Sequence, residues 1–146
     1  MPGILEKPPA SADEYACWLP RHRRSGSAAR RLLREFLTGW PDGERYVQAA
    51  ESVLTELVNN AVQHARTPHG RLVMIRFELR PGQLRVEVHD AGDAVPTPRT
   101  AGAEDEGGRG LRLVEQLSTG WGCHPRAGGV GKVVWATVGP AGGDAR

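Results

Sequence analysis

The sequence has few of the features that would place a protein in a membrane, outside the cell or around a metal cluster. None of its apolar runs approaches the roughly 20 residues that a membrane-spanning helix needs. The N-terminal stretch MPGILEKPPASADE lacks the apolar core of a signal peptide. The cysteines, Cys17 and Cys123, have neither CxxC spacing nor metal-ligand neighbours. We therefore expect a reduced, cytoplasmic protein without membrane contact.

The sequence also lacks a strong net charge of either sign. Nineteen Lys and Arg against 17 Asp and Glu give a formal charge of +2, which identifies no partner. The arginine-rich segment Arg21–Arg34 contains no acidic residue, so it is a candidate nucleic-acid surface. We favour an ordinary basic helix face without nucleic-acid contact, because the nearby aromatic residue, Phe36, falls on the apolar side of the predicted helix.

Hydrophobic periodicity predicts one domain, and 146 residues are enough for one core. The apolar residues recur at helical spacing in 26–38, 44–65 and 111–118. They alternate as in strands in 71–80 and 84–90, which form a hairpin around PGQ, and further strands are expected at 14–20 and 133–138. The domain should span 14–138, with flexible tails at 1–13 and 139–146.

The stretch TELVNNAVQHA, residues 55–65, carries an unusual polar stripe. On a helical wheel the apolar residues share one face, and the polar residues share the other: Glu56, Asn59, Asn60, Gln63 and His64. Asparagine lowers helix propensity, so two adjacent ones suggest a use beyond solvation. Oxygen acceptors on a face without Lys or Arg suit Mg²⁺, although a solvated polar face is the alternative.

Two glycine-containing segments are further candidates for ligand contacts. In HDAGD, Asp90 ends a predicted strand and is placed to accept hydrogen bonds from a ligand amine, with Gly92 allowing close approach; a plain Asx-turn is the alternative. In EGGRGLRLVEQL, glycines come directly before a predicted helix, where exposed N–H groups can hold a phosphate; a flexible loop is the alternative.

Two better-known phosphate motifs are excluded. GGVGKV resembles part of a P-loop, but Arg126 stands where that motif has glycine, and Val133 replaces its Ser or Thr. No G-x-G-x-x-G follows a strand, which excludes the dinucleotide-binding fingerprint.

The motifs occur in an order that is more specific than any one of them. The chain offers E-x-x-x-N-A on a helix, D-x-G at a strand end, a long glycine-rich loop and G-x-G-L at a helix start. This resembles the ATP-binding domain shared by gyrase, histidine kinases and MutL (the GHKL superfamily), and most of all its small branch of anti-sigma-factor serine/threonine kinases. The resemblance covers residues 14–138. It implies the Bergerat ATP-binding fold, an α/β (α+β) two-layer sandwich whose mixed, largely antiparallel sheet is covered on one face by about three helices.

The resemblance also implies roles for individual residues. Glu56 matches the proposed general base, Asn60 the residue that binds Mg²⁺ through its amide oxygen, and Asp90 the acceptor for the adenine amino group, with Gly92 beside it. The loop that wraps the phosphates, and the further candidate contacts, are then Gly108, Arg109, Gly110 and Leu111, and Asn59, His64 and Lys132. Residues 94–107 match the mobile lid.

The function implied is an ATP- and Mg²⁺-dependent anti-sigma regulatory factor that phosphorylates a serine on an anti-sigma-factor antagonist. Its partners would be that antagonist and a sigma factor. The resemblance does not decide between a monomer and a homodimer. Two positions depart from the pattern: Ala94 replaces the second glycine of D-x-G-x-G, and Glu106 stands where some of these kinases have arginine. The departures bear on phosphoryl transfer more than on ATP binding, so an ATP-dependent protein-binding module without kinase activity is the alternative.

Overall fold

The computed structural model describes residues 13–64, 72–90, 106–126 and 131–142. Its helices and strands follow one another along the chain as β1 (Glu14–Pro20), α1 (Ser25–Thr38), α2 (Glu44–His64), β2 (Leu72–Arg80), β3 (Gln83–Asp90), α3 (Glu106–Leu117), β4 (Gly120–Pro125) and β5 (Lys132–Val138). Every predicted element except the third helix lies within one residue of its expected bounds. None of the helices in this part of the chain is long and apolar enough to cross a bilayer.

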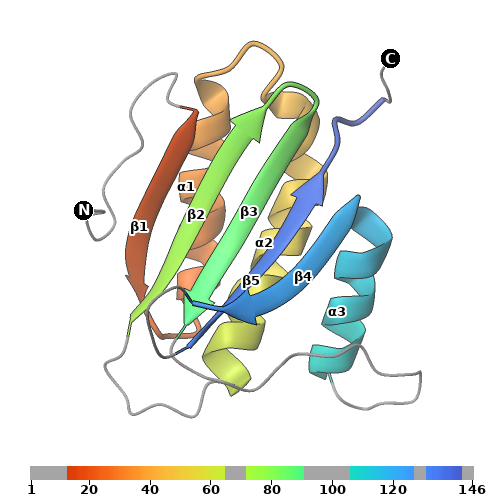
Figure 1. The fold of residues 1–146 in the computed structure, drawn as a ribbon. Coiled ribbons are helices and arrows are strands. Elements are labelled where there is room, and N and C mark those ends of the chain that lie inside the picture. Colours follow the sequence, from red (N-terminus) through yellow and green to blue (C-terminus); the bar gives the residue numbers. More distant parts are fainter. Residues whose placement is uncertain (1–12, 65–71, 91–105, 127–130, 143–146) are drawn as a thin grey trace.

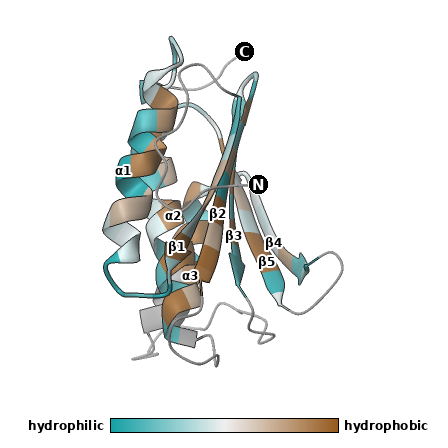
Figure 2. Ribbon diagram, turned by 90° about the vertical axis from the view of Figure 1, so that its left-hand side faces the viewer, coloured by the Kyte–Doolittle hydropathy of each residue, from teal (hydrophilic) through white to brown (hydrophobic). Residues whose placement is uncertain are grey.

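The domain has two layers, a sheet and the helices that cover one of its faces. Figure 1 looks onto the open face of the sheet with the helices behind it, and Figure 2 shows the same layers from the side. The strand order is β1-β2-β3-β5-β4. All four pairings are antiparallel, so the expected two-layer fold is confirmed, with a fully antiparallel sheet in place of a mixed one among the described strands.

The core lies between these layers because the apolar residues alternate along the strands. Val73, Ile75 and Phe77 of β2 are fully buried on the helical side. They meet the apolar face of α1, where the ring of Phe36 lies 5.6 Å from that of Phe77. Burying such a side chain contributes about 1.5–3 kcal/mol. The alternation thus fixes which face of the sheet receives the helices.

Two elements differ from the expectation. The third helix was expected to begin at residue 111, but α3 begins at Glu106. The glycines Gly108 and Gly110 therefore lie inside the helix and do not form a loop before it. Packing against α2 outweighs the low helix propensity of glycine here.

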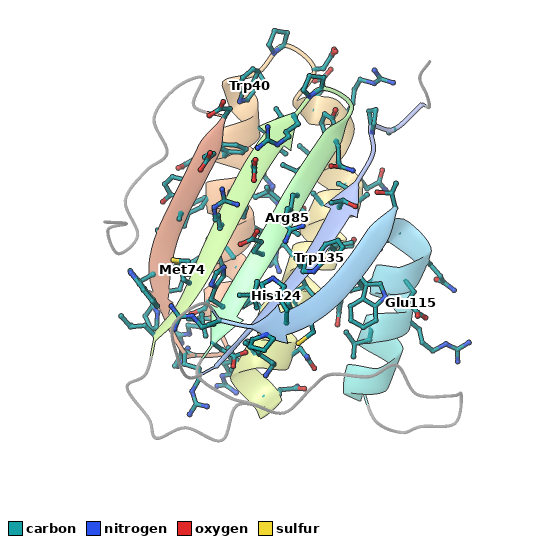
Figure 3. All side chains as sticks on the ribbon, in the orientation of Figure 1. Trp40, Met74, Arg85, Glu115, His124 and Trp135 are labelled. Carbon is teal, nitrogen blue, oxygen red and sulfur yellow. The ribbon has the colours of Figure 1, made fainter. Side chains whose placement is uncertain are left out.

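Strand β4 was not predicted, because the sequence GWGCHP combines glycine, histidine and proline and has a weak strand signal. Its pairing with β5 explains one of the glycines. A Cβ on Gly122 would lie 3.0 Å from the indole nitrogen of Trp135 on the neighbouring strand. The glycine thus leaves room for the indole, over which the Arg85 guanidinium lies 4.4 Å from the ring centroid (Figure 3).

The open face of the sheet carries a network of ion pairs. Arg76 on β2 donates hydrogen bonds to Glu78 (3.0 Å) and, across the strands, to Glu87 (3.3 Å). Glu87 also accepts a hydrogen bond from Arg85 at 2.7 Å and contacts the ring of His89 at 2.8 Å. Burial alone would raise the pKa of Glu87, but the hydrogen bonds of His89 and Arg85 and the charges of Arg76 and Arg85 outweigh it and lower the pKa to about 2.

The lowered pKa of Glu87 predicts acid sensitivity. Because the folded-state pKa of about 2 lies below the ordinary glutamate value of 4.5, the stabilisation is complete above pH 4.5 and is lost as the pH falls toward 2. Glu87→Gln should lower the free energy of unfolding by about 1–2 kcal/mol at pH 7. Urea denaturation of both proteins between pH 7 and pH 3 checks this; a difference that does not shrink on acidification would contradict it.

Substitution of Gly43, which lies between α1 and α2, should have a larger effect on stability. A Cβ there would lie 1.9 Å from the backbone carbonyl oxygen of Leu37, so the helix–helix connection would have to shift. We expect Gly43→Ala to cost about 3 kcal/mol in unfolding free energy. Gly82→Ala is the matched control, because Gly82 has φ +75° but open space around it, and should cost about 1 kcal/mol. Equal costs in thermal denaturation would show that the connection is not tight.

Candidate functional site

The ends of four elements meet at one edge of the sheet, which we call the gathered edge. In Figure 1, the C-terminal end of α2, the end of β3 and the starts of β5 and α3 lie at the lower edge of the domain. Helix α2 packs against β3, β5 and α3, and its polar stripe lies in its second half, toward this edge. Segments that are far apart in the sequence therefore meet at this edge.

The polar stripe of α2 is partly covered. Asn60 is 9% exposed, whereas Glu56 and Asn59 are half-buried. The adjacent residues Leu57 and Val58 are fixed in the core, with exposures of 1% and 0%. Because Leu57 and Val58 are buried, the rotation of α2 about its axis is fixed. The direction in which Glu56, Asn59 and Asn60 point is therefore fixed as well.

Helix α1 contacts the stripe from one side. The Arg30 guanidinium donates a hydrogen bond to the hydroxyl of Thr55 at 3.1 Å. Gly26, in the first turn of α1, lies close to the amide oxygen of Asn59, since a Cβ on Gly26 would lie 3.4 Å from that oxygen. The first turn of α1 thus lies beside Asn59. The sequence alone did not indicate this contact.

Asp90 and Lys132 form a buried ion pair where β3 and β5 meet. They are direct partners in the strand register, and their side chains are on the inner face because they continue the alternation of Val88 and Val134. Asp90 is 2% exposed and Lys132 5% exposed, and the Lys132 ammonium lies 3.3 Å from the carboxylate oxygen Oδ1. Charges at this depth require such compensation.

Cys123 is close to this pair. It lies on the inner face of β4, opposite Val134, and is half-buried. Burial raises the pKa of its thiol; the charge of Lys132 opposes this increase, and that of Asp90 adds to it. The thiol therefore stays protonated near neutral pH and is a weak nucleophile.

The structure places the predicted residues as follows. Asn60 and Glu56 lie one turn apart in the second half of α2, whose C-terminal end shares an edge of the domain with the end of β3, where Asp90 is the last residue. The residues expected as a phosphate-binding loop are instead in the first turns of α3, where Leu111 is 3% exposed: Gly108, Arg109, Gly110 and Leu111. His64 is the last residue of α2. Gly92, Ala94 and the expected lid up to residue 105 lie outside the described residues.

Sequence reasoning named Asp90 and Lys132 separately but missed their pairing. A signal was present, because Lys132 precedes Val134 and Ala136 with strand periodicity, which places a lysine on the inner face. A lysine at such a position requires a partner.

The donor set limits the metal chemistry of this edge. Among the described residues, no three His, Cys, Asp or Glu side chains come together as metal ligands. The amide of Asn60 and the carboxylate of Glu56 supply oxygen atoms only. Such a set fits Mg²⁺, which keeps several waters and takes further oxygens from phosphates, and does not fit zinc.

Comparisons with known proteins identify a family for most of the chain. The family described as "Histidine kinase-like ATPase domain" matches residues 19–138. Among solved structures, the chain resembles the histidine kinase domain from the Erythrobacter litoralis EL346 blue-light activated histidine kinase, with 23% identity and a TM-score of 0.48. That match covers 83% of this chain and 61% of the other, so the chain spans about three fifths of that structure. No curated protein matches.

The family match extends from the end of β1 to the end of β5 and includes the whole gathered edge. The chain therefore belongs to the histidine kinase-like ATPase domain family, a class of ATP-binding domains.

Proposed function

We propose that the domain binds ATP with Mg²⁺ at the gathered edge and transfers the terminal phosphoryl group to a serine of a partner protein. The partner would be an anti-sigma-factor antagonist, and a sigma factor would be the regulated target, as the sequence resemblance implies. This makes the protein an anti-sigma regulatory factor with serine/threonine kinase activity.

One observation carries the proposal. The second half of α2 carries Glu56 and Asn60 and ends at the sheet edge where β3 ends with the buried Asp90, and the apolar face of α2 is buried in the core. A nucleotide site needs two such parts. One is an acceptor for the amino group of the base, and the other is a set of oxygen ligands for the metal that accompanies the phosphates.

Each residue then has a defined task. The amide oxygen of Asn60 would hold Mg²⁺, which neutralises the charge of the phosphates when it is bound. Glu56 would accept the proton of the serine hydroxyl, and Asp90 would accept a hydrogen bond from the amino group of the base. Positioning and electrostatics supply most of the rate in phosphoryl transfer, so a helix held rigidly by the core suits this task.

Loss of the Asn60 amide should weaken Mg²⁺-dependent binding. Asn60→Ala keeps the helix, because alanine has the highest helix propensity, but it removes the metal ligand. We expect the Kd for ATP in Mg²⁺ to rise by at least about tenfold, with a much smaller change in EDTA. Calorimetry measures both, and Gln48→Ala, an exposed polar residue in the first half of α2, is the control. A wild type that does not bind Mg·ATP at millimolar concentration would refute the proposal.

Loss of the Glu56 carboxylate should separate catalysis from binding. Glu56→Gln keeps the shape of the side chain but cannot accept the proton, so transfer should fall by about 10²–10⁴-fold while the Kd for ATP changes less than about threefold. The assay measures transfer of the labelled phosphoryl group from ATP to candidate antagonist proteins in the presence of Mg²⁺. If the wild type binds ATP but phosphorylates none of them, the protein is an ATP-dependent binding module; unchanged transfer by Glu56→Gln would exclude it as the base.

A further inference from the structure

Three arginines lie at the end of β1, where the chain turns into α1. Arg23 and Arg24 are exposed in the turn between these two elements. The third, Arg126, follows the last residue of β4, and its guanidinium lies 5.9 Å from the ring centroid of Trp18 on β1. This contact joins distant parts of the sheet, because β1 and β4 are its opposite edge strands. We call Arg23, Arg24, Arg126 and Trp18 the arginine corner.

Hydrogen bonds fix the turn that carries Arg23 and Arg24. The backbone N–H of His22 donates to the carbonyl oxygen of Pro20 at 2.9 Å, and that of Ser25 donates to the carbonyl oxygen of His22 at 2.9 Å. The hydroxyl of Ser25, which is 4% exposed, also donates to the carbonyl oxygen of Pro20. The turn is therefore a defined part of the fold, and the two exposed arginines are held on a fixed backbone.

The arginine corner lacks acidic partners in the described part of the chain. On the open face of the sheet, Arg76 and Arg85 each pair with a glutamate. None of the described acidic side chains forms an ion pair with an arginine of the corner. Like charges repel one another, so this accumulation of cations is unfavourable until an anion neutralises it.

The start of α1 makes the positive charge less favourable still. A helix N-terminus carries a partial positive charge, so acidic residues stabilise it and cations destabilise it. Arg24 is at the N-cap position of α1, its side chain makes no capping hydrogen bond, and the first turn contains no acidic residue. The sequence therefore gives up a common means of stabilising a helix, as proteins do at functional surfaces.

The side chains of the corner indicate the kind of anion. Guanidinium groups bind carboxylates through paired, charge-assisted hydrogen bonds. Single-stranded nucleic acid would require, besides cations, aromatic faces that are open for base stacking. Trp18 is half-buried, and the guanidinium of Arg126 lies over its ring. The ring thus holds a cation in place and offers no open stacking face on that side.

We propose that the arginine corner is a docking surface for an acidic segment of a protein partner. Arg23, Arg24 and Arg126 bind its carboxylates, and Trp18 positions Arg126. The corner shares no residue with the nucleotide site, so this inference goes beyond the proposed function and does not depend on ATP.

The test measures peptide binding to the whole chain by fluorescence anisotropy, without nucleotide. The probe is a fluorescein-labelled peptide of alternating Glu and Ser, and a peptide of alternating Gln and Ser is its neutral counterpart. At low salt, wild type should bind the acidic peptide at least about tenfold more tightly than the neutral one. The difference should shrink as salt is added, because salt screens exposed charges.

Charge reversals locate the surface. Arg24→Glu and Arg126→Glu should each raise the Kd for the acidic peptide by at least about fivefold. Arg112→Glu, at an exposed position of α3, is the matched control because it changes the net charge by the same amount. It should change the Kd by less than about twofold.

Arg24→Glu should affect stability in the opposite direction to binding. An acidic residue at the start of a helix interacts favourably with the helix dipole, so this variant should unfold at a higher temperature than wild type although it binds the peptide more weakly. If the variant instead unfolds at a lower temperature, Arg126→Glu decides whether the corner binds the peptide.

Three results would overturn this inference. The first is a wild type that binds both peptides equally, and the second is an Arg112→Glu variant that loses as much affinity as the corner variants. The third is a single-stranded oligothymidine that binds more tightly than the acidic peptide and loses affinity in the corner variants, which would assign the surface to nucleic acid. None of these results concerns ATP binding, so the proposed function is decided by its own experiments.

Discussion

The packing of α2 against β3 and β5 is the contact on which the rest of the structure depends. It buries residues such as Leu54, Leu57 and Val58 completely or nearly so, and each contributes about 1.5–3 kcal/mol. Because this face is fixed, the rotation of the helix is fixed as well. The polar face can then carry Asn59 and Asn60, which have poor helix propensity, since packing and not propensity holds the helix.

The same contact explains how residues from distant segments come together. The antiparallel pairing of β3 and β5 places the last residue of one strand opposite the first of the other, so Asp90 meets Lys132 directly. The C-terminal end of α2 and the start of α3 lie at the same edge of the domain. The polar groups at this edge are thus supported by elements that each bury an apolar face, and the ligand chemistry proposed for them depends on that support.

Much of this arrangement follows from periodicity in the sequence. Strand alternation and the helical stripe placed β1, β2, β3, β5, α1 and α2 within one residue, because burial dominates in these segments. Strand β4 and the start of α3 could not be predicted, since glycine-rich segments carry little local preference and tertiary contacts decide them. For the candidate site, motif order indicated Glu56, Asn60 and Asp90. The pairing of Asp90 with Lys132 follows from the strand register, and the contact of Gly26 with Asn59 follows from helix packing. Neither is visible from local sequence.

The two cysteines differ in a way that has a practical consequence. Cys17 is fully enclosed in the core, whereas Cys123 is partly accessible and lies within the electrostatic influence of Asp90 and Lys132. Because burial raises the pKa of the Cys123 thiol, attaching a fluorophore or spin label to it requires alkaline pH, and the label then lies next to the buried charges. Occupancy of that neighbourhood becomes observable by spectroscopy without engineering a new thiol into the chain.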